Sequence, residues 1–296
     1  MKKLLADDYI NGFRSKKLYK YFRFSNKRET KKRLNQIIKG KIWMSKRKKL
    51  NDPFDLILAK FIYSDNEQSY YDYLSELQET KEVLCLTTDP FNLLMWSHYG
   101  DGHRGYCIEF QPIFHILNDK EFPIEYIKKR PNITQIFKDF YDSKERLIQG
   151  HNEEAIFSYK LSPMFYYKNE CWAYEKEHRI ISYSKNDKSE GSLHDLMDLG
   201  LKITRIICGL NCSKENIKII KNACEKINRK NYREAKNKLT EYTEKKINEI
   251  LLKNPEITKD EVIKLILEKT FDWQVVDLTR LISDDNFKLN EIKIDL

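Results

Sequence analysis

The chain lacks the features that mark disulfide-stapled, zinc-binding, membrane-spanning and NTP-hydrolysing proteins. Its six cysteines are scattered, and no Cys-x-x-Cys pair occurs. Because zinc sites need closely spaced cysteine or histidine ligands, we expect reduced thiols and no metal. No stretch approaches the ~20 apolar residues of a membrane span, and the first residues carry no apolar segment of signal-peptide length. We therefore expect a cytoplasmic protein without a membrane partner.

Two catalytic signatures are also missing. The phosphate-binding pattern GxxxxGK[ST] does not occur among the 9 glycines, which argues against a P-loop NTPase. The nucleophile elbow GxSxG of the α/β-hydrolases is absent too. A function must therefore be sought in carboxylates, aromatic residues and cations, which the chain has in abundance.

Positive charge is in excess. Lysine and arginine number 54 against 45 aspartates and glutamates, which gives a formal net charge of +9. Such a field favours association with a polyanion such as RNA or DNA. The alternative is a lysine-rich surface that reflects composition alone, and the sequence leaves both interpretations open.

The periodicity predicts an α+β fold. Alternating apolar residues predict strands at 18–22, 41–45, 83–87, 106–110 and 203–209, with further strands near 124–127, 164–167 and 172–183. Helical spacing predicts helices at 28–39, 67–78 and 133–156, and a series of helices from residue 213 to 270. A late strand is expected at 273–278, followed by a weak tail at 281–296. We expect an N-terminal arm at 1–17, a core at 18–210 and a mainly helical extension at 211–296.

The pair Glu175 and Glu177 is the strongest chemical signal. It leads into the apolar strand around Ile180, and Trp172 and Tyr174 flank it. In an extended chain, side chains two residues apart point to the same face, so we expect both carboxylates to face one space. Paired carboxylates between aromatic side chains suit the capture of a cationic or oxocarbenium-like centre. A solvated turn with local ion pairs remains the alternative.

Two other segments are rich in polar groups. Glycines at 100, 102 and 105 follow His98 and Tyr99 and allow the backbone to approach a ligand closely. The sequence Asn-Asp-Pro-Phe-Asp at 51–55 is a typical turn, and it brings two carboxylates, Asp52 and Asp55, into a loop.

Taken together, these segments resemble a bacterial family described as domain of unknown function 2971. The matching residues are Leu-Tyr-Lys-Tyr at 18–21, Asn-Asp-Pro-Phe-Asp at 51–55, the Trp-Ser-His-Tyr-Gly segment within 94–101, residues 104–110, and the Glu-x-Glu segment at 172–180. They run in family order over about residues 18–210, and the helical region 229–270 looks like an insertion. The family carries no functional assignment.

The order strand, helix, strand and late Glu-x-Glu strand also resembles, more loosely, the ADP-ribosyltransferase fold. That resemblance implies two small, mostly antiparallel sheets with peripheral helices, and NAD as substrate. It implies that Glu177 stabilises the oxocarbenium ion while Glu175 orients or deprotonates the acceptor. The residues expected to bind NAD are Tyr19, Tyr21, Ser45, Asn51, Asp52, His98, Tyr99 and Arg179. Near the first strand, Lys20 and Arg23 are the cations at hand.

Three functional hypotheses follow. The first is a mono-ADP-ribosyltransferase or NAD glycohydrolase that serves as a toxin or anti-phage effector, with RNA or DNA as a possible acceptor. The second is a basic nucleic-acid-binding or nuclease module; metal-dependent cleavage would require Asp52, Asp55 and Glu109 to converge. The third is an interaction element at 213–270 that binds an antitoxin, another partner protein or a second copy of the chain.

Overall fold

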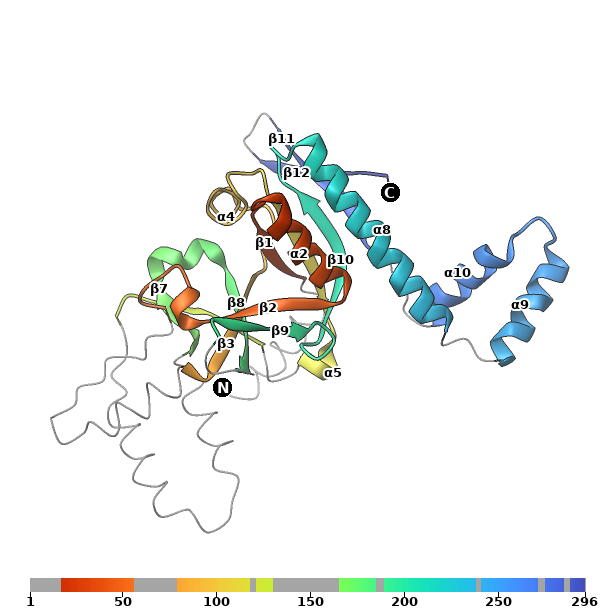
Figure 1. Cartoon of the computed structure of the whole chain (residues 1–296), viewed down its shortest axis with the longest axis horizontal. Helices are drawn as coiled ribbons and strands as arrows, with labels where there is room; N and C mark the ends of the chain where they lie inside the picture. The colour runs from red at the N-terminus through yellow and green to blue at the C-terminus, as the bar shows by residue number, and fades with distance from the viewer. Residues whose placement is uncertain are drawn as a thin grey trace, which may run out of the picture. The chain divides into compact units, whose positions relative to one another are not determined.

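The structure is a computed structural model, and it describes residues 17–55, 79–117, 121–129, 165–184, 189–237, 241–270, 275–284 and 288–295. This part of the chain contains twelve strands and six α-helices (Figure 1). The chain divides into two compact units. The first comprises residues 1–20, 41–95 and 112–202, and the second comprises residues 21–40, 96–111 and 203–296. Each unit is described in turn.

The first unit is organised around β3 (Lys81–Thr87). One antiparallel partner, β8 (Glu177–Tyr183), pairs with β3 along its whole length, from Lys81↔Tyr183 to Thr87↔Glu177. Its other antiparallel partners are β1 (Leu18–Phe22), which pairs at Thr87, and β2 (Lys41–Lys46), which pairs at Val83 and Glu82. Because nearly every residue of β3 is buried, both faces of this strand lie in the core.

Further short elements complete this unit. The strand β9 (Gly191–Asp195) pairs with β2, and β5 (Glu121–Pro123) pairs with β8, both antiparallel. The strands β6 (Glu125–Ile127) and β7 (Tyr167–Asn169) form a separate parallel pair. The helices are α5 (Phe114–Leu117) and the 3₁₀ turns η1 (Arg47–Lys49) and η4 (Glu170–Glu175). The helix α4 (Leu93–His98) begins in this unit and ends in the second.

In the second unit the strand order is β12 (Leu289–Lys293), β11 (Asp277–Ser283), β10 (Leu201–Cys208) and β4 (Tyr106–Pro112). The pair β10–β11 is parallel, and β11–β12 is antiparallel. The helix α2 (Lys27–Ile38) packs against α8 (Lys214–Lys236). Each begins at a side-chain cap, Asn26 for α2 and Ser213 for α8, as expected for helices that follow polar turns.

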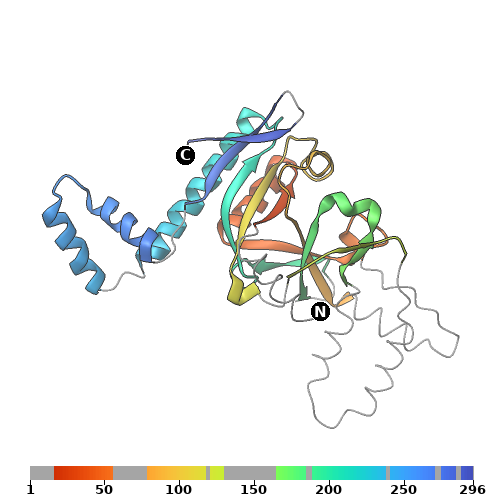
Figure 2. The same cartoon turned by 180° about the vertical axis from the view of Figure 1, so that it is seen from behind.

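The last two helices, α9 (Glu241–Lys253) and α10 (Lys259–Thr270), form a hairpin next to the C-terminal end of α8 (Figure 2). Their contact buries Ile247, Val262 and Ile263 against Ala235 of α8. The helix α10 begins with a capping box, in which Thr258 and Glu261 bond reciprocally, as the sequence predicts.

The α+β class and the C-terminal helical region are confirmed. The strand expected at 18–22 has these bounds, and the helix expected at 28–39 is α2. The sheets differ from the expected pair of small sheets, because ten of the described strands belong to one mixed, mostly antiparallel sheet. The expected arm at 1–17 lies almost entirely outside the described residues, and the helices expected at 67–78 and 133–156 lie wholly outside them.

The C-terminal prediction was the least accurate. The late strand begins at Asp277 rather than 273, and the expected weak tail contains β12. Of the five residues of β12 only Leu289 is buried, so the segment offers little apolar pattern. Its strand conformation depends on five residue pairs with β11, which is a tertiary interaction.

Candidate functional site

Five charged side chains of the first unit meet in its interior. We call them the buried charged cluster: Asp55, Lys168, Glu175, Glu177 and Arg179. The Lys168 ammonium lies at its centre, and it donates to Glu175 Oε2 at 2.5 Å and to Glu177 Oε2 at 3.0 Å. It also lies 3.5 Å from Asp55 Oδ2. One cation therefore holds three carboxylates that come from two segments of the chain, the turn at Asp55 and the Glu175–Glu177 pair.

Arg179 is the second cation, and its residue is 0% exposed. Its Nε donates to Glu177 Oε1 at 2.7 Å, and its Nη2 donates to Glu177 Oε2 at 3.0 Å and to Asp55 Oδ2 at 2.6 Å. Its Nη1 donates to the Phe165 carbonyl at 2.8 Å. A planar guanidinium is suited to such a fork-shaped contact. The role of Arg179 in NAD binding stays a prediction, and in the structure its guanidinium holds Glu177 and Asp55.

The cluster has an excess of negative charge. Three carboxylates and two cations give the cluster a formal charge of −3 + 2 = −1. Burial alone would raise the pKa of Glu177, but Arg179 and Lys168 outweigh it and hold that pKa well below its usual range. Burial alone would lower the pKa of Lys168, but Glu177, Glu175 and Asp55 raise it. Glu177 is therefore a fixed anion at neutral pH, suited to stabilising positive charge and not to donating a proton.

The two glutamates converge for a reason different from the predicted one. Glu175 ends η4, Glu177 begins β8, and between them Lys176 adopts the left-handed conformation, with φ 45° and ψ 48°. The chain is therefore kinked and not extended at this point. The Glu175 carbonyl accepts from Thr87 Oγ1 at 2.6 Å, and the Glu177 N–H donates to Tyr126 Oη at 2.8 Å. These bonds hold the kink in which both carboxylates reach Lys168.

The expected aromatic side chains do flank the pair. The ring of Trp172 has its centroid 5.0 Å from Lys168 Nζ, within the range of a cation–π contact. Tyr174 is tilted against Trp172 at 6.1 Å between ring centroids. Both residues are partly exposed, whereas Glu175 and Glu177 are each only 4% exposed. The aromatic pair is thus partly exposed to solvent, and Trp172 lies next to the central cation of the cluster.

The pairing of β1, β2 and β8 with β3 shows where two of the residues expected to bind NAD lie. Tyr19 pairs with Thr87, which pairs with Glu177, so these three residues lie in one row across three strands. Ser45 pairs with Val83, which pairs with Ile181. Because Ile181 is four residues from Glu177, this row lies about 13 Å along the strand. Tyr19 is thus near the cluster, and Ser45 is on the same face but farther away.

The turn at 51–55 serves the cluster indirectly. Asn51 is exposed, while the buried Asp52 accepts from the Phe54 N–H at 2.9 Å through Oδ1. The Asp52 carbonyl accepts from the Asp55 N–H at 3.0 Å. Asp52 thus shapes the turn, and that turn carries Asp55 into the cluster.

Tyr21, His98 and Tyr99 belong to the second unit, so the site described here is built without them. Tyr21 packs edge-on against Trp96, with ring centroids 4.9 Å apart. The nearby glycines contact the protein's own backbone. A Cβ on Gly105 would lie 2.1 Å from the Phe22 carbonyl oxygen, and one on Gly209 would lie 2.3 Å from that of His103. Close packing therefore explains these two glycines without a ligand.

Sequence reasoning missed Lys168 and did not assign Asp55 to this site. Neither follows from local periodicity, because Asp55 and Arg179 are 124 positions apart. One physical signal was available. Two buried carboxylates require cationic partners, since an unpaired buried charge is very costly. That requirement predicts partners but does not say which lysine or arginine supplies them.

A second buried cluster lies on β3 and β9. Glu82 Oε2 accepts from Ser192 Oγ at 2.6 Å and lies 2.7 Å from His194 Nε2, and Glu82 Oε1 accepts from Ser184 Oγ at 3.0 Å. Burial alone would raise the pKa of Glu82, but the bonds from Ser192, His194 and Ser184 lower it. This cluster satisfies a fully buried carboxylate, as core packing requires.

Two searches of the described residues gave negative results. Within the described ranges, no group of three or more histidine, cysteine, aspartate or glutamate side chains could hold a metal ion. None of the helices that the structure describes is both long and apolar enough to cross a bilayer.

Comparison with protein families found one match. A family model described as protein of unknown function (DUF2971) matches residues 95–180. The expected resemblance to this family is thus confirmed for that segment, which contains Lys168, Glu175, Glu177 and Arg179. Asp55 lies outside it. The comparisons with curated proteins and with solved structures gave no match.

Proposed function

We propose that the protein consumes NAD, as a mono-ADP-ribosyltransferase or an NAD glycohydrolase, with Glu177 as its catalytic carboxylate. The observation that carries the proposal is the buried charged cluster. It holds an ionised Glu177 in fixed geometry, has a formal charge of −1, and lies beside the ring of Trp172. A preorganised anion in a desolvated site is what a developing oxocarbenium ion requires.

The reaction would proceed at the nicotinamide ribose. The C1′–N bond breaks, and its electron pair leaves with nicotinamide, which becomes neutral. Positive charge then develops on C1′ and the ring oxygen, and Glu177 stabilises it, as carboxylates do in glycoside hydrolysis. An acceptor hydroxyl or water attacks C1′, and its proton passes to Glu175, whose Oε2 lies 2.5 Å from Lys168. Lys168 and Arg179 are positioning residues that hold the two carboxylates.

The order of elements also supports this function. The succession β1, α2, β2 and a late strand that begins at Glu177 is the element order that the resemblance to ADP-ribosyltransferases implies, although most strands form one sheet and not two small ones. Because Glu175 and Glu177 are each only 4% exposed, the proposal requires η4 and Trp172 to move when the ribose enters. Depletion of NAD would suit a toxin or an anti-phage effector.

Labelled NAD provides the test. The purified protein is incubated with NAD labelled in the adenine moiety, with and without RNA, DNA and protein acceptors, and nicotinamide release is followed. We expect release, with label transfer if an acceptor is used. Glu177→Gln should reduce the rate by about 10²–10³, the usual cost of losing one preorganised electrostatic contact.

Glu170→Gln is the matched control, because Glu170 is exposed and lies on the same 3₁₀ turn. It should keep full activity. No nicotinamide release under any condition, or an equal loss in both variants, would contradict the proposal.

The nuclease alternative has less support. Asp55 is bound by Arg179 and Lys168, Asp52 shapes its turn, and Glu109 accepts from Thr204 Oγ1 at 2.6 Å and pairs with Arg205. Each of the three carboxylates thus has a structural role. Nucleic-acid binding without cleavage is favoured by a separate observation on α8.

A further inference from the structure

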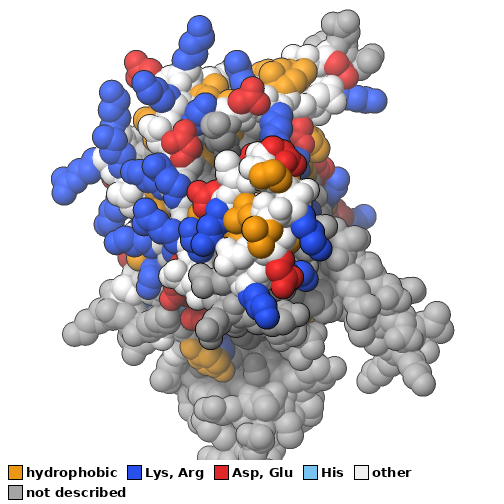
Figure 3. Space-filling view, turned by 90° about the vertical axis from the view of Figure 1, so that its right-hand side faces the viewer, with side chains coloured by type: hydrophobic (Ala, Val, Ile, Leu, Met, Phe, Trp, Pro, Cys, Tyr) orange, Lys and Arg blue, Asp and Glu red, His pale blue; other side chains and the backbone are white. Residues whose placement is uncertain are grey.

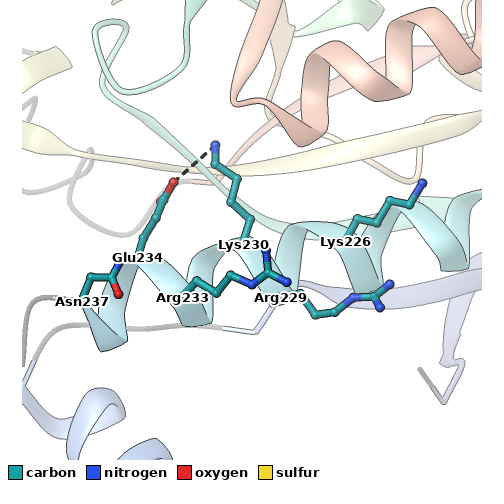
Figure 4. A pocket seen from close by; sticks show the side chains of 6 residues that line it. All are labelled: Lys226, Arg229, Lys230, Arg233, Glu234 and Asn237. Carbon is teal, nitrogen blue, oxygen red and sulfur yellow. Dashed lines mark ion pairs between the residues drawn. The ribbon is translucent and has the colours of Figure 1, made fainter.

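We propose that the exposed face of α8 binds the phosphate backbone of a nucleic acid. Four cations line one side of this helix and are called the α8 basic stripe: Lys226, Arg229, Lys230 and Arg233. Together with Glu234 and Asn237 they line a cavity of about 490 Å³ (Figure 4). The inference concerns the second unit alone and does not depend on chemistry at Glu177.

Helical periodicity creates the stripe. Positions 226, 229, 230, 233 and 237 follow the spacing i, i+3, i+4, i+7 and i+11, which places them on one face. At 1.5 Å per residue the stripe from Lys226 to Arg233 is about 10 Å long. The other face of α8 is committed to the core of the unit through Ile220, Ala223, Cys224 and Ile227, all buried. The helix thus has one face for packing and one for an external partner.

The stripe keeps its positive charge. Its four cations and Glu234 give +4 − 1 = +3. Two ion pairs lie along it, Lys230 with Glu234 at 3.6 Å and Arg229 with Glu225 at 3.8 Å. Pairs this exposed are worth about 0–1 kcal/mol, so phosphates can compete for both cations. Figure 4 shows the first pair as a dashed line, with Arg229 and Arg233 extending along the helix.

The stripe is part of a wider basic surface. Over its 23 residues α8 carries eight lysines and arginines and three glutamates, or +5. The helix α2, which packs against α8, carries five cations and one glutamate, or +4. Lys230 lies beside the end of α2, because its Nζ would be 3.5 Å from a Cβ built on Gly40, just after that helix. In Figure 3 lysine and arginine side chains gather densely on one side of the view.

The residue types of the α8 basic stripe indicate which class of partner it binds. All six lining residues are polar or charged, so the stripe has no large apolar side chain for insertion into a lipid surface. None is aromatic, so it cannot stack unpaired bases as a single-strand platform does. A row of four cations about 10 Å long instead matches a polymer with regularly spaced phosphates, where duplex DNA carries one charge per ~3.4 Å of each strand. Binding through the backbone should be independent of base sequence.

The salt dependence of binding tests the inference on the full-length protein. Fluorescence anisotropy would measure the dissociation constant for a labelled 20-base-pair DNA duplex and an RNA hairpin between 50 and 300 mM KCl. The key variant is R229Q/R233Q, which removes two cations of the stripe. We expect weaker binding, with the slope of log K against log salt reduced by about 2, roughly one per lost phosphate contact.

The matched control is K245Q/K246Q, because both lysines are exposed on α9 and the variant loses the same charge. We expect its slope to change by less than half as much. An equal loss in both variants would overturn the proposal, since it would indicate a net-charge effect. So would undetectable nucleic-acid binding, or binding only to vesicles that contain 30% phosphatidylserine. The measurement uses no NAD, so its outcome is separate from that of the proposed reaction, and circular dichroism establishes that each variant is folded.

Discussion

Lys168 and Glu177 are joined by a hydrogen bond of 3.0 Å between two side chains that are 3% and 4% exposed. The same ammonium bonds Glu175, and the same carboxylate is held by Arg179. The contact thus links the catalytic carboxylate of the proposed reaction to the packing of its surroundings. Changes at either residue should alter stability as well as activity.

Removal of the central cation should be strongly destabilising. Lys168→Met keeps an unbranched side chain of similar length but leaves three buried carboxylates with Arg179 as their remaining cation in the cluster. We expect the free energy of unfolding to fall by about 3–5 kcal/mol, the usual cost of breaking a buried ion pair. Urea denaturation followed by circular dichroism measures it.

Lys176→Met is the control for that change. Its ammonium lies 2.8 Å from Asp89, but the side chain is 57% exposed. We expect a loss below about 1 kcal/mol. Comparable losses of unfolding free energy in the two variants would show that burial does not increase the contribution of the cluster to stability.

Stability should depend on pH through Glu177. Because its pKa is lowered in the folded state, the unfolded chain binds its proton first as the pH falls. The contribution of Glu177 to the free energy of unfolding is complete at pH values above its unfolded pKa of about 4.3. It is lost as the pH falls from there through the folded pKa. Urea unfolding between pH 2.5 and 7 should show this decline. Glu177→Gln should flatten it, and an unchanged pH slope in this variant would contradict the assignment.

NAD should change the environment of Trp172. This partly exposed ring has its centroid 5.0 Å from Lys168 Nζ, so NAD bound at the neighbouring Glu177 would contact or displace it. We expect NAD to shift or quench the tryptophan fluorescence of the wild-type protein. In Trp172→Phe most of that change should disappear. A full-sized change in the variant would place the response at another of the 4 tryptophans.

Gly105 should tolerate no side chain. A Cβ there would lie 2.1 Å from the Phe22 carbonyl oxygen and 2.8 Å from that of Gly100, and backbone cannot move aside cheaply. Gly105→Ala should therefore cost about 1–3 kcal/mol or more. Gly102→Ala meets nothing closer than 3.7 Å, although its φ is +59°. Its cost should be about 1 kcal/mol, from backbone conformation alone. Thermal denaturation of both variants separates steric from conformational effects.

Much of the fold follows from local pattern. The strand Leu18–Phe22, the helix Lys27–Ile38 and the capped start of α10 agree with the sequence because alternation, helical spacing and capping act within a few residues. The strand Leu289–Lys293 was missed because it has one buried residue and depends on its partner strand. The single large sheet was missed for the same reason, since strand pairing is a long-range interaction.

The sequence alone determined that Glu175 and Glu177 lie together beside aromatic residues, because residues so close in the chain stay close in any fold. Only the tertiary structure decided how they meet, through the left-handed Lys176 and not an extended strand. Only the tertiary structure supplied the cation Lys168, and only it brought in Asp55, from 124 positions before Arg179, as a third carboxylate that shares the two cations. Buried charges must be neutralised by whatever cations the fold brings near, and periodicity carries no information about which ones those are.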